Sequence, residues 1–329
     1  MTPPSTAAPS RVLVTGANGF IGRHLRRTLE ERGFNHLGAV RTPGSGDDPR
    51  TCVVGDLGPW TDWSAALRGV NMVVHLAGRA HVLRETAANP DAEFMRVNAE
   101  GTAALVAAAV AAGVSRFVYL SSIGVLGSDS GNGSFTAASA PRPHNGYARS
   151  KLAGEIAAKT VAASGLEVVV LRPPLVYGPG VRANFLRLLR SVDRGWPLPL
   201  GAVKNRRSLV SVWNLCDLVV NVLRNPAAPG RTWMVSDGED LSTPELIRRI
   251  GKAMGRHVRL VPVPVGLMQW GAALVGRQAL ITQLCGSLTL DIASTRDELK
   301  WSPPVSVEEA LARTANWFLA EGRSGKVHE

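Results

Sequence analysis

Cysteine is scarce in this sequence and poorly placed for pairing. Only Cys52, Cys216 and Cys285 occur in 329 residues, an odd number at wide spacings among apolar residues. Secreted domains that depend on disulfides carry more cysteines at closer spacings. We therefore expect three buried free thiols and a reducing compartment, the cytoplasm.

Long apolar runs are also missing. The longest uncharged helix-like run, Thr102–Ser115, is shorter than the roughly 20 apolar residues that cross a bilayer. The first ten residues lack the basic start and apolar core of a secretion signal. The sequence thus predicts no integral membrane segment. The apolar stretch Leu260–Ile281, interrupted by Arg277, is expected to pack in a small lobe, with a membrane-surface role as the alternative.

Lysine is rare as well, although the net charge is +11. Six of the 37 basic residues are lysine, and the arginines are scattered, with no cluster interleaved with aromatic residues. This pattern argues against nucleic-acid binding and favours a general attraction for anionic ligands such as nucleotides. The seven histidines show no metal-like pairing with cysteines or carboxylates, so no metal site is predicted and His75 is expected in the core.

The start of the chain carries a glycine-rich motif. An apolar strand-like run, Arg11–Thr15, leads into Gly16, Gly19 and Gly22, which precede the helical run Leu25–Leu29. Gly16 permits a tight turn, Gly19 lets a pyrophosphate approach the backbone, and Gly22 lets the helix lie close to the strand. Because the N-terminus of that helix attracts anions, the motif predicts dinucleotide binding.

Strand-like runs alternate with helix-compatible segments over the first half of the chain. The predicted strands are Arg11–Thr15, His36–Val40, Cys52–Val54, Met72–Leu76, Arg116–Leu120 and Glu167–Leu171. Helices are expected over Asp91–Ala112, Tyr147–Ser164 and Asn214–Leu223, between Thr243 and Gly255, and from Ser306 onward. The alternation predicts an α/β fold with a doubly wound parallel sheet of the Rossmann type. We expect residues 1–180 to form an NAD(P)-binding domain to which residues 211–228 return, and 181–329 to form mainly a smaller C-terminal substrate-binding lobe.

The residues that follow the second and third strands bear on the cofactor. Arg41 stands where a carboxylate would bind the ribose hydroxyls of NAD, and no acidic residue follows before Asp47. Because a 2′-phosphate needs a cation, Arg41 favours NADP over NAD, with a solvated surface arginine as the alternative. Asp56 could accept a hydrogen bond from the adenine amino group or cap a following helix, and the small pair Ala77-Gly78 would leave room for a dinucleotide.

A tyrosine and a lysine lie one helical turn apart. Tyr147 and Lys151 are spaced i and i+4, about 5–6 Å apart at Cβ on one helix face. The ammonium is expected to favour the phenolate and lower the pKa of the tyrosine. Coincidence is a weak explanation, because the chain has only three tyrosines and six lysines. Ser122 would complete the set by donating a hydrogen bond to a substrate oxygen.

These motifs together resemble the extended short-chain dehydrogenase/reductase family, most of whose members modify nucleotide sugars. The segment Leu171–Gly180 and the closing Trp301-Ser-Pro-Pro resemble further parts of that family. The resemblance implies that Tyr147 is the acid/base, that Lys151 orients the nicotinamide ribose, and that Ser122 holds the reacting oxygen. It implies a cofactor site made of Gly16, Asn18, Gly19, Phe20, Ile21, Gly22, Arg41, Asp56, Leu57, Leu76, Ala77, Gly78, Asn98, Tyr147, Lys151 and Pro174.

The same resemblance implies substrate contacts from Ser122, Asn184 and Arg207. Arg206-Arg207 stand where nucleotide-sugar members keep an arginine for the substrate diphosphate, and a planar guanidinium suits two phosphate oxygens. A surface turn is the alternative reading. Members of the family commonly dimerise through two long helices, and those carrying Asn98 and Tyr147 could supply such a homodimer contact.

Three reactions use this apparatus. A 4,6-dehydratase of the family has an Asp-Glu pair after the serine position, where this chain has Ile123-Gly124, so dehydration is not predicted. Arg41 and the missing acidic residue favour an NADPH-dependent 4-keto reduction over a 4-epimerisation with NAD. Residues 77–82, 205–210 and 235–242 also resemble a bacterial polysaccharide-biosynthesis subgroup of such reductases and epimerases, and this resemblance implies a UDP-linked 4-keto-6-deoxy-N-acetylhexosamine as the substrate. A dinucleotide sensor without turnover remains a further alternative, although such proteins usually lose the Tyr/Lys pair.

Overall fold

The computed structural model describes residues 10–43, 48–80, 88–160, 165–274, 276 and 284–321. The chain divides into two compact units. The first contains the residues up to Val125, Pro143–Arg172 and Cys216–Trp233, and the second contains Leu126–Arg142, Pro173–Leu215 and the chain from Met234 on. Residues 126–142, which we expected in the nucleotide domain, thus belong to the second unit. Predicted features at Asp47, His81-Val82, Ser164 and 277–281 lie outside the described residues.

The first unit is built on a seven-stranded sheet with the strand order β3-β2-β1-β4-β5-β6-β9. Its strands are β1 (Arg11–Thr15), β2 (Asn35–Val40), β3 (Thr51–Val53), β4 (Met72–His75), β5 (Arg116–Leu120), β6 (Glu167–Arg172) and β9 (Thr232–Met234). All pairings among β1 to β6 are parallel. The six predicted strands are confirmed to within one residue at each end, and β9 is an addition. The strand order reverses between β1 and β4, which is where such sheets bind ligands.

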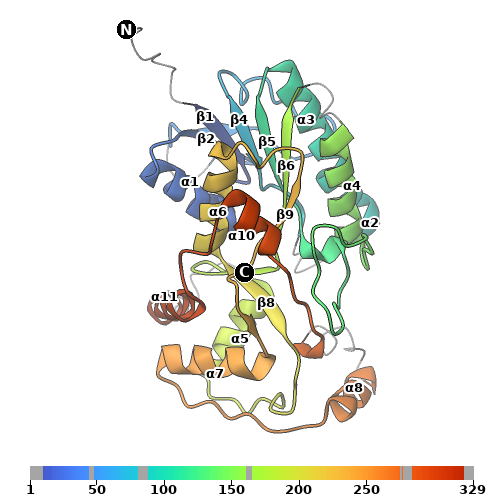
Figure 1. Ribbon diagram of the computed structural model, residues 1–329, viewed down its shortest axis with the longest axis vertical. Helices are drawn as coiled ribbons and strands as arrows, with labels where there is room; N and C mark the ends of the chain where they lie inside the picture. The colour runs from blue at the N-terminus through green and yellow to red at the C-terminus, as the bar shows by residue number, and fades with distance from the viewer. Residues whose placement is uncertain are drawn as a thin grey trace. The chain divides into compact units, whose positions relative to one another are not determined.

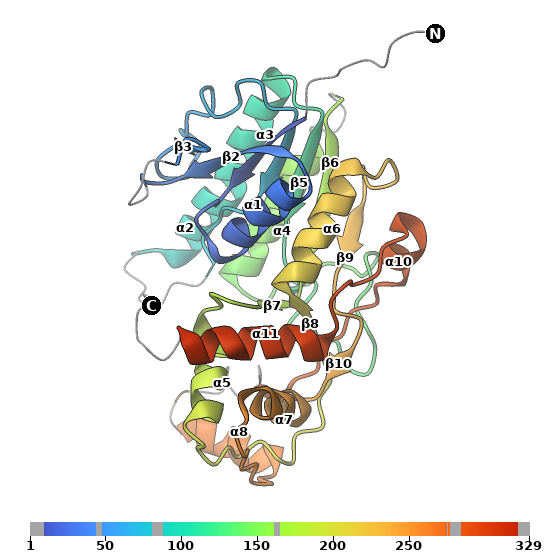
Figure 2. The same cartoon turned by 90° about the vertical axis from the view of Figure 1, so that its left-hand side faces the viewer.

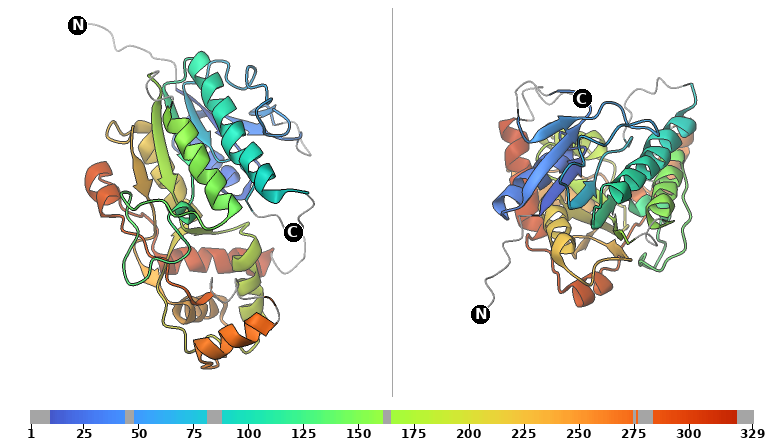
Figure 3. Two further views of the ribbon diagram at one scale, coloured as in Figure 1. Left: turned by 90° about the vertical axis from the view of Figure 1, so that its right-hand side faces the viewer. Right: turned by 90° about the horizontal axis from the view of Figure 1, so that it is seen from above.

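Helices cover both faces of this sheet, as a doubly wound fold requires. Figure 2 shows α1 (Phe20–Glu31) and α6 (Val212–Arg224) in front of the strands. The left panel of Figure 3 shows α3 (Gly101–Ala111) and α4 (Gly146–Thr160) on the opposite face. Every residue of β4 and β5 is buried between these layers. The predicted Rossmann-type sheet is therefore confirmed (Figure 1).

The single helix predicted over Asp91–Ala112 is wrong in its middle. The chain forms α2 (Pro90–Met95), then a wide π-helical turn, η1 (Arg96–Glu100), and then α3. Asn98, which the π turn carries, is 1% exposed. A π turn inserts an extra residue into the helix and is frequent at functional sites, and here it turns Asn98 inward.

The second unit has a three-stranded sheet of β7 (Leu175–Tyr177), β8 (Arg207–Ser211) and β10 (Asp240–Leu241). Strand β8 is central, parallel to β7 and antiparallel to β10. The helices of this unit are α5 (Ala183–Asp193), α7 (Thr243–Met254), α8 (Val265–Leu274), α10 (Ala293–Leu299) and α11 (Val307–Ala320).

The helix boundaries predicted in the second unit are confirmed. Ser242 and Glu245 form a reciprocal capping box at the start of α7, and Gly255 ends that helix with φ of 63°. Ser306 caps α11 by accepting a hydrogen bond from the backbone N–H of Glu309.

All three cysteines are free thiols, as predicted, but only Cys216 is buried, while Cys52 and Cys285 are half-buried. Burial raises the pKa of the Cys216 thiol. No helix in the described ranges is both long enough and apolar enough to cross a membrane.

Candidate active site

The turn between β1 and α1 is too tight for side chains. Gly16 has φ of 65°, and the N–H of Gly19 donates to the carbonyl oxygen of Gly16 at 2.9 Å. A Cβ added to Gly22 would lie 2.2 Å from that oxygen, and one added to Gly16 would lie 2.9 Å from the backbone nitrogen of Ala77. The N-cap residue of α1 is Gly19, which makes no side-chain capping bond. The turn therefore offers backbone N–H groups and a positive helix end to an anion, and it fits the pyrophosphate of a dinucleotide.

The remaining predicted residues of this turn lie close by in the chain. Asn18 is exposed in the turn itself, while Phe20 and Ile21 are half-buried in the first turn of α1. The ring of Phe20 packs edge-on against His24 one turn further along, at 5.7 Å between centroids. These residues border the glycine turn, and their contacts with a cofactor stay predictions.

Two opposite charges stand beyond the ends of β2 and β3. The Nε of Arg41 lies 3.8 Å from Oδ1 of Asp56, and the two side chains are 76% and 75% exposed. No helix follows Asp56 before β4, so the helix-cap interpretation of this residue is wrong. A long, solvated ion pair is weak. The guanidinium of Arg41 can therefore turn to a 2′-phosphate, and the carboxylate of Asp56 can accept a hydrogen bond from an adenosine.

The loop after β4 is held by the end of β1. Thr15 Oγ1 accepts hydrogen bonds from the backbone N–H groups of Leu76, at 3.2 Å, and Ala77, at 3.1 Å. Thr15 also hydrogen-bonds Nδ1 of His75 at 2.7 Å, and His75 Nε2 meets Thr102 Oγ1 at 3.1 Å. Burial lowers the pKa of His75 to about 3. His75 is therefore a neutral core residue, as predicted.

Asn98 joins this loop to α4. Its Oδ1 accepts from the backbone N–H of Arg79 at 2.8 Å, and its Nδ2 donates to Arg79 O and to Ser150 Oγ, both at 2.9 Å. A side chain at Gly78 would collide with Asn98 Oδ1, at 2.7 Å. The sequence predicted Asn98 as a cofactor contact. In the structure Asn98 is buried, lies against Gly78 and holds the backbone of Arg79 through two hydrogen bonds.

Leu57 is tied to the same π turn, because Arg96 Nη1 donates to its carbonyl oxygen at 2.9 Å. The π turn thus contacts the chain that follows β3 as well as the chain that follows β4. Both segments belong to the predicted cofactor site.

The three predicted catalytic residues lie together in the first unit. Ser122 follows β5, and Tyr147 lies in the first turn of α4. The ring of Tyr147 packs edge-on against Phe94 at 6.1 Å between centroids. Lys151 is only 5% exposed, and its Nζ lies 4.1 Å from the centre of the Tyr119 ring.

The predicted lowering of the tyrosine pKa is wrong in this structure. Burial raises the pKa of Tyr147, although the hydrogen bond from Ser122 offsets part of this. Burial also lowers the pKa of Lys151 to about 7, against the opposing effect of Glu155. Both shifts have one cause, since a low-dielectric site disfavours phenolate and ammonium alike. The phenol is therefore protonated at neutral pH when no ligand is bound.

A buried ion pair missed by the sequence reasoning anchors α4. Glu155, one turn beyond Lys151, accepts from Arg172 Nε at 2.9 Å and Nη2 at 2.6 Å, and also from the hydroxyl of Ser121. Glu155 and Arg172 are 2% and 4% exposed. Because breaking a buried pair costs about 3–5 kcal/mol, this contact fixes α4 against the ends of β5 and β6. The only sequence feature that pointed to Glu155 was its position four residues after Lys151, which places both side chains on one face of the helix.

The other predicted contact residues lie in the second unit. Pro174 directly precedes β7, Asn184 lies in the first turn of α5, and Arg207 begins β8. Arg207 is half-buried in the central strand, so the surface-turn interpretation is wrong for it. Its Nη1 donates to Gly286 O at 3.0 Å. Burial lowers the pKa of Arg207, and the carboxylate of Asp129 opposes that shift. The contacts of Asn184 and Arg207 with a substrate stay predictions.

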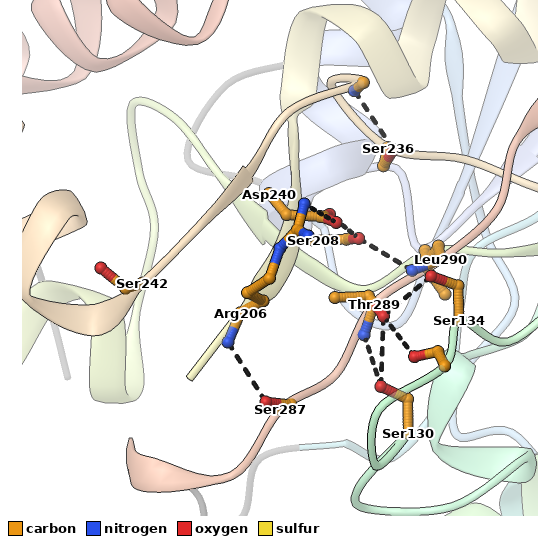
Figure 4. Close-up of polar contacts among 12 residues, drawn as sticks. Ser130, Ser134, Arg206, Ser208, Ser236, Asp240, Ser242, Ser287, Thr289 and Leu290 are labelled. Carbon is orange, nitrogen blue, oxygen red and sulfur yellow. Dashed lines mark hydrogen bonds and ion pairs between the residues drawn. The ribbon is translucent and has the colours of Figure 1, made fainter. Parts of the chain in front are cut away.

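Figure 4 shows how the strand of Arg207 is fixed within the second unit. Thr289 donates through Oγ1 to Gly133 O at 2.7 Å, and its N–H donates to Ser130 Oγ at 3.1 Å. The N–H of Ser208 donates to Leu288 O at 2.9 Å, and Ser208 Oγ accepts from the N–H of Leu290 at 2.9 Å. These bonds tie β8 through residues 288–290 to the segment 126–142, which follows Ser122 in the chain.

Known proteins resemble this chain over most of its length. Residues 12–236 match the model of the NAD dependent epimerase/dehydratase family. The UDP-glucose 4-epimerase of Vibrio cholerae is 38% identical over 315 residues, covering 94% of this chain and 96% of the relative. The N-acetyl-alpha-D-glucosaminyl-diphospho-ditrans,octacis-undecaprenol 4-epimerase of Escherichia coli O157:H7 is 26% identical over 266 residues, covering 78% and 77%.

A solved structure is similar to this chain over almost its full length. The dTDP-glucose 4,6-dehydratase DesIV of Streptomyces venezuelae, with NAD and TYD bound, superposes with a TM-score of 0.76 at 28% identity, covering 97% of this chain and all of its own. Together with the matched family model and the Vibrio cholerae relative, the glycine turn and the Ser122, Tyr147 and Lys151 arrangement lead to one conclusion. This chain belongs to the NAD-dependent epimerase/dehydratase family.

Proposed function

We propose that this chain catalyses the 4-epimerisation of a UDP-linked hexose. The observation that carries the proposal is the placement of Ser122, Tyr147 and Lys151 in the unit that also holds the glycine turn. The 38% identity with a UDP-glucose 4-epimerase supports the choice of reaction. The catalytic roles follow from the chemistry of these side chains.

The bound dinucleotide would supply the hydride acceptor and donor for C4. Tyr147 would remove the proton of the C4 hydroxyl during oxidation at C4 and return it to the C4 oxygen during the reduction that follows. Ser122 holds the C4 oxygen by a hydrogen bond, and Lys151 orients the ribose of the cofactor. Because burial keeps Tyr147 protonated in the ligand-free site, we expect its phenolate only when the oxidised, positively charged cofactor is present.

The residues that follow Ser122 argue against dehydration. Elimination of water needs an acid and a base near C5 and C6, and Ile123 and Gly124 offer neither. Ile123 is also 5% exposed, so it serves the core.

A 4-keto reductase is the second candidate, and Arg41 favours it. The guanidinium of Arg41 is largely exposed and only loosely paired with Asp56, so it can donate hydrogen bonds to the 2′-phosphate of NADPH. In this reaction Tyr147 would give its proton to the carbonyl oxygen while hydride moves to C4. The substrate would then be a UDP-linked 4-keto-6-deoxy-N-acetylhexosamine. Relatives of the chain act on sugars carried by UDP and by a polyprenyl diphosphate, and we propose UDP for this chain.

One experiment with two arms separates these reactions. Purified protein is given UDP-glucose or UDP-N-acetylglucosamine without added cofactor, and the C4 epimer is followed by NMR. In parallel, it is given NADPH and UDP-4-keto-6-deoxy-N-acetylglucosamine, and the nicotinamide absorbance is followed. Epimer formation with a co-purified NAD supports the proposal, while loss of absorbance alone establishes the reductase. Dinucleotide binding without turnover in either arm would indicate the sensor alternative.

A further inference from the structure

Helix α8 presents an uncharged apolar face to solvent. Leu267 and Trp270, three residues apart and therefore on one side of the helix, are 58% and 65% exposed. Met268 and Ala272, on the other side, are buried at 9% and 7% and attach the helix to its own unit. Val265–Leu274 contains no Asp, Glu, Lys or Arg. In Figures 1 and 2 this helix lies at the lower edge of the second unit, beyond α7.

Two further exposed apolar side chains lie on the chain segments next to α8. Val261, four residues before the helix, is 44% exposed, and Trp196 is 53% exposed. Backbone hydrogen bonds join their segments, because the N–H of Leu198 donates to Arg259 O and the N–H of Val261 donates to Leu198 O, both at 2.9 Å. The exposed apolar residues therefore come from neighbouring parts of one unit. Single exposed apolar residues are common on protein surfaces, whereas a group of them indicates an interaction site.

The same segments carry positive charge. Residues 190–204 and 255–274 contain five basic residues and one acid, Asp193, which already binds Arg256 at 3.1 Å. Four of the basic residues are exposed, namely Arg194, Lys204, Arg256 and Arg259. Arg194 lies over the ring of Trp196 at 4.9 Å, so a cation and an indole are presented together. This charge balance is complementary to an anionic surface.

We propose that this region docks on the surface of an anionic phospholipid membrane. We call it the α8 surface and define it by Trp196, Val261, Leu267, Trp270 and the four exposed basic residues. Tryptophan and leucine partition into the boundary between headgroups and acyl chains, while arginine and lysine attract the lipid phosphates. The attachment is peripheral, since no described helix meets the length and apolarity needed to span a bilayer. It would bring the enzyme to the membrane without contributing to its chemistry.

The test uses the full chain with vesicles of phosphatidylcholine alone and vesicles with added phosphatidylglycerol. Sedimentation should recover the protein with the anionic vesicles and leave it in solution with the neutral ones. The double variant Leu267→Glu/Trp270→Glu, and separately Lys204→Glu/Arg259→Glu, should each weaken binding about tenfold or more. Trp60→Glu is the matched control, because Trp60 is 66% exposed in the other unit, and it should bind as the wild type does. All variants should keep wild-type turnover in solution.

Three outcomes would overturn the proposal. The wild type could fail to bind the anionic vesicles at low salt, or the α8 variants could bind as well as the wild type. Light scattering could instead show a dimer that Leu267→Glu/Trp270→Glu dissociates, which would assign the surface to a second copy of the chain. None of these results bears on the epimerase assay, so the two proposals fail separately.

Discussion

At the residue scale, burial sets the protonation of the two groups proposed to carry the chemistry. Burial holds the Tyr147 phenol protonated and brings the pKa of Lys151 to about 7. Burial therefore disfavours both the Tyr147 phenolate and the Lys151 ammonium in the ligand-free protein. We therefore expect the Tyr147 phenolate to form only when a positively charged ligand is bound.

The pKa of Lys151 gives a testable pH dependence of stability. The pKa of Lys151 is about 7 in the folded protein, below its ordinary value of 10.5. Between pH 7 and pH 10.5 the unfolded chain therefore binds more protons than the folded protein. The contribution of Lys151 to the free energy of unfolding consequently rises with pH over this range. Lys151→Met removes this dependence. We expect the substitution to stabilise dinucleotide-free protein most at pH 7 and below, with a gain that shrinks by about 1.4 kcal/mol per pH unit above pH 7.

Urea denaturation of both proteins at pH 6, 7, 8 and 9 measures this difference. A difference in unfolding free energy that stays constant from pH 6 to pH 9 would contradict the assignment of a depressed pKa to Lys151.

Residue identities and spacings could be predicted at this scale, but protonation could not. The i and i+4 spacing of Tyr147 and Lys151 is local, and the structure places both on α4. The direction of their pKa shifts depends on Phe94, Tyr119 and the sheet beneath them, which are distant in the sequence. The partner of Glu155, Arg172, lies 17 residues away and is fixed only by the packing of α4 on β6.

At the element scale, α4 is positioned by its close approach to the π turn. Gly154 makes this approach possible, since a Cβ there would lie 2.3 Å from Tyr119 Oη and 2.6 Å from Asn98 O. The same helix carries Tyr147 and Lys151. Any displacement of α4 at this contact therefore moves the two proposed catalytic groups.

The substitution Gly154→Ala tests this contact. A glycine inside a helix usually gains up to about 1 kcal/mol of stability when changed to alanine. Here the collision should reverse the sign and cost about 1–3 kcal/mol, together with most of the turnover. The control is Gly266→Ala in α8, where the added Cβ meets no atom within 4 Å among the described residues outside its chain neighbours and its own helix backbone, and stability should stay equal or rise. Thermal unfolding and turnover are measured on both, and equal effects of the two substitutions would refute the packing argument.

The type of an element could be predicted where a short sequence motif specifies it. The prediction failed where contacts between distant residues decide the structure. The glycine turn, the six strands and the capped start of α7 follow from short motifs and are confirmed. The π turn at Arg96–Glu100 was missed because its sequence is compatible with an ordinary helix and its widening accompanies the buried bonds of Asn98. Strand β9 has only three residues, too few for a periodic pattern. Its place beside β6 comes from the sheet.

At the scale of the whole molecule, the net charge of +11 should assist capture of an anionic substrate. Salt screens such attraction, with a Debye length of about 10 Å at 0.1 M. We expect kcat/KM for the UDP-sugar to fall about three- to tenfold between 20 and 300 mM NaCl, with kcat nearly unchanged. Steady-state kinetics across this range provides the check, and a kcat/KM that does not vary with salt would contradict it.

The central claim is that the phenol of Tyr147 transfers the proton during redox chemistry at C4 of a nucleotide-linked sugar. The most direct measurement compares wild type and Tyr147→Phe for turnover of the UDP-hexose and for bound dinucleotide. Tyr177→Phe serves as the control, because Tyr177 is a buried tyrosine that donates to Asp237 at 2.8 Å. We predict that Tyr147→Phe keeps its dinucleotide and loses about 10²- to 10⁴-fold in turnover, while Tyr177→Phe keeps its turnover per folded molecule. A Tyr147→Phe enzyme that retains dinucleotide and turns over within about threefold of wild type would contradict the claim.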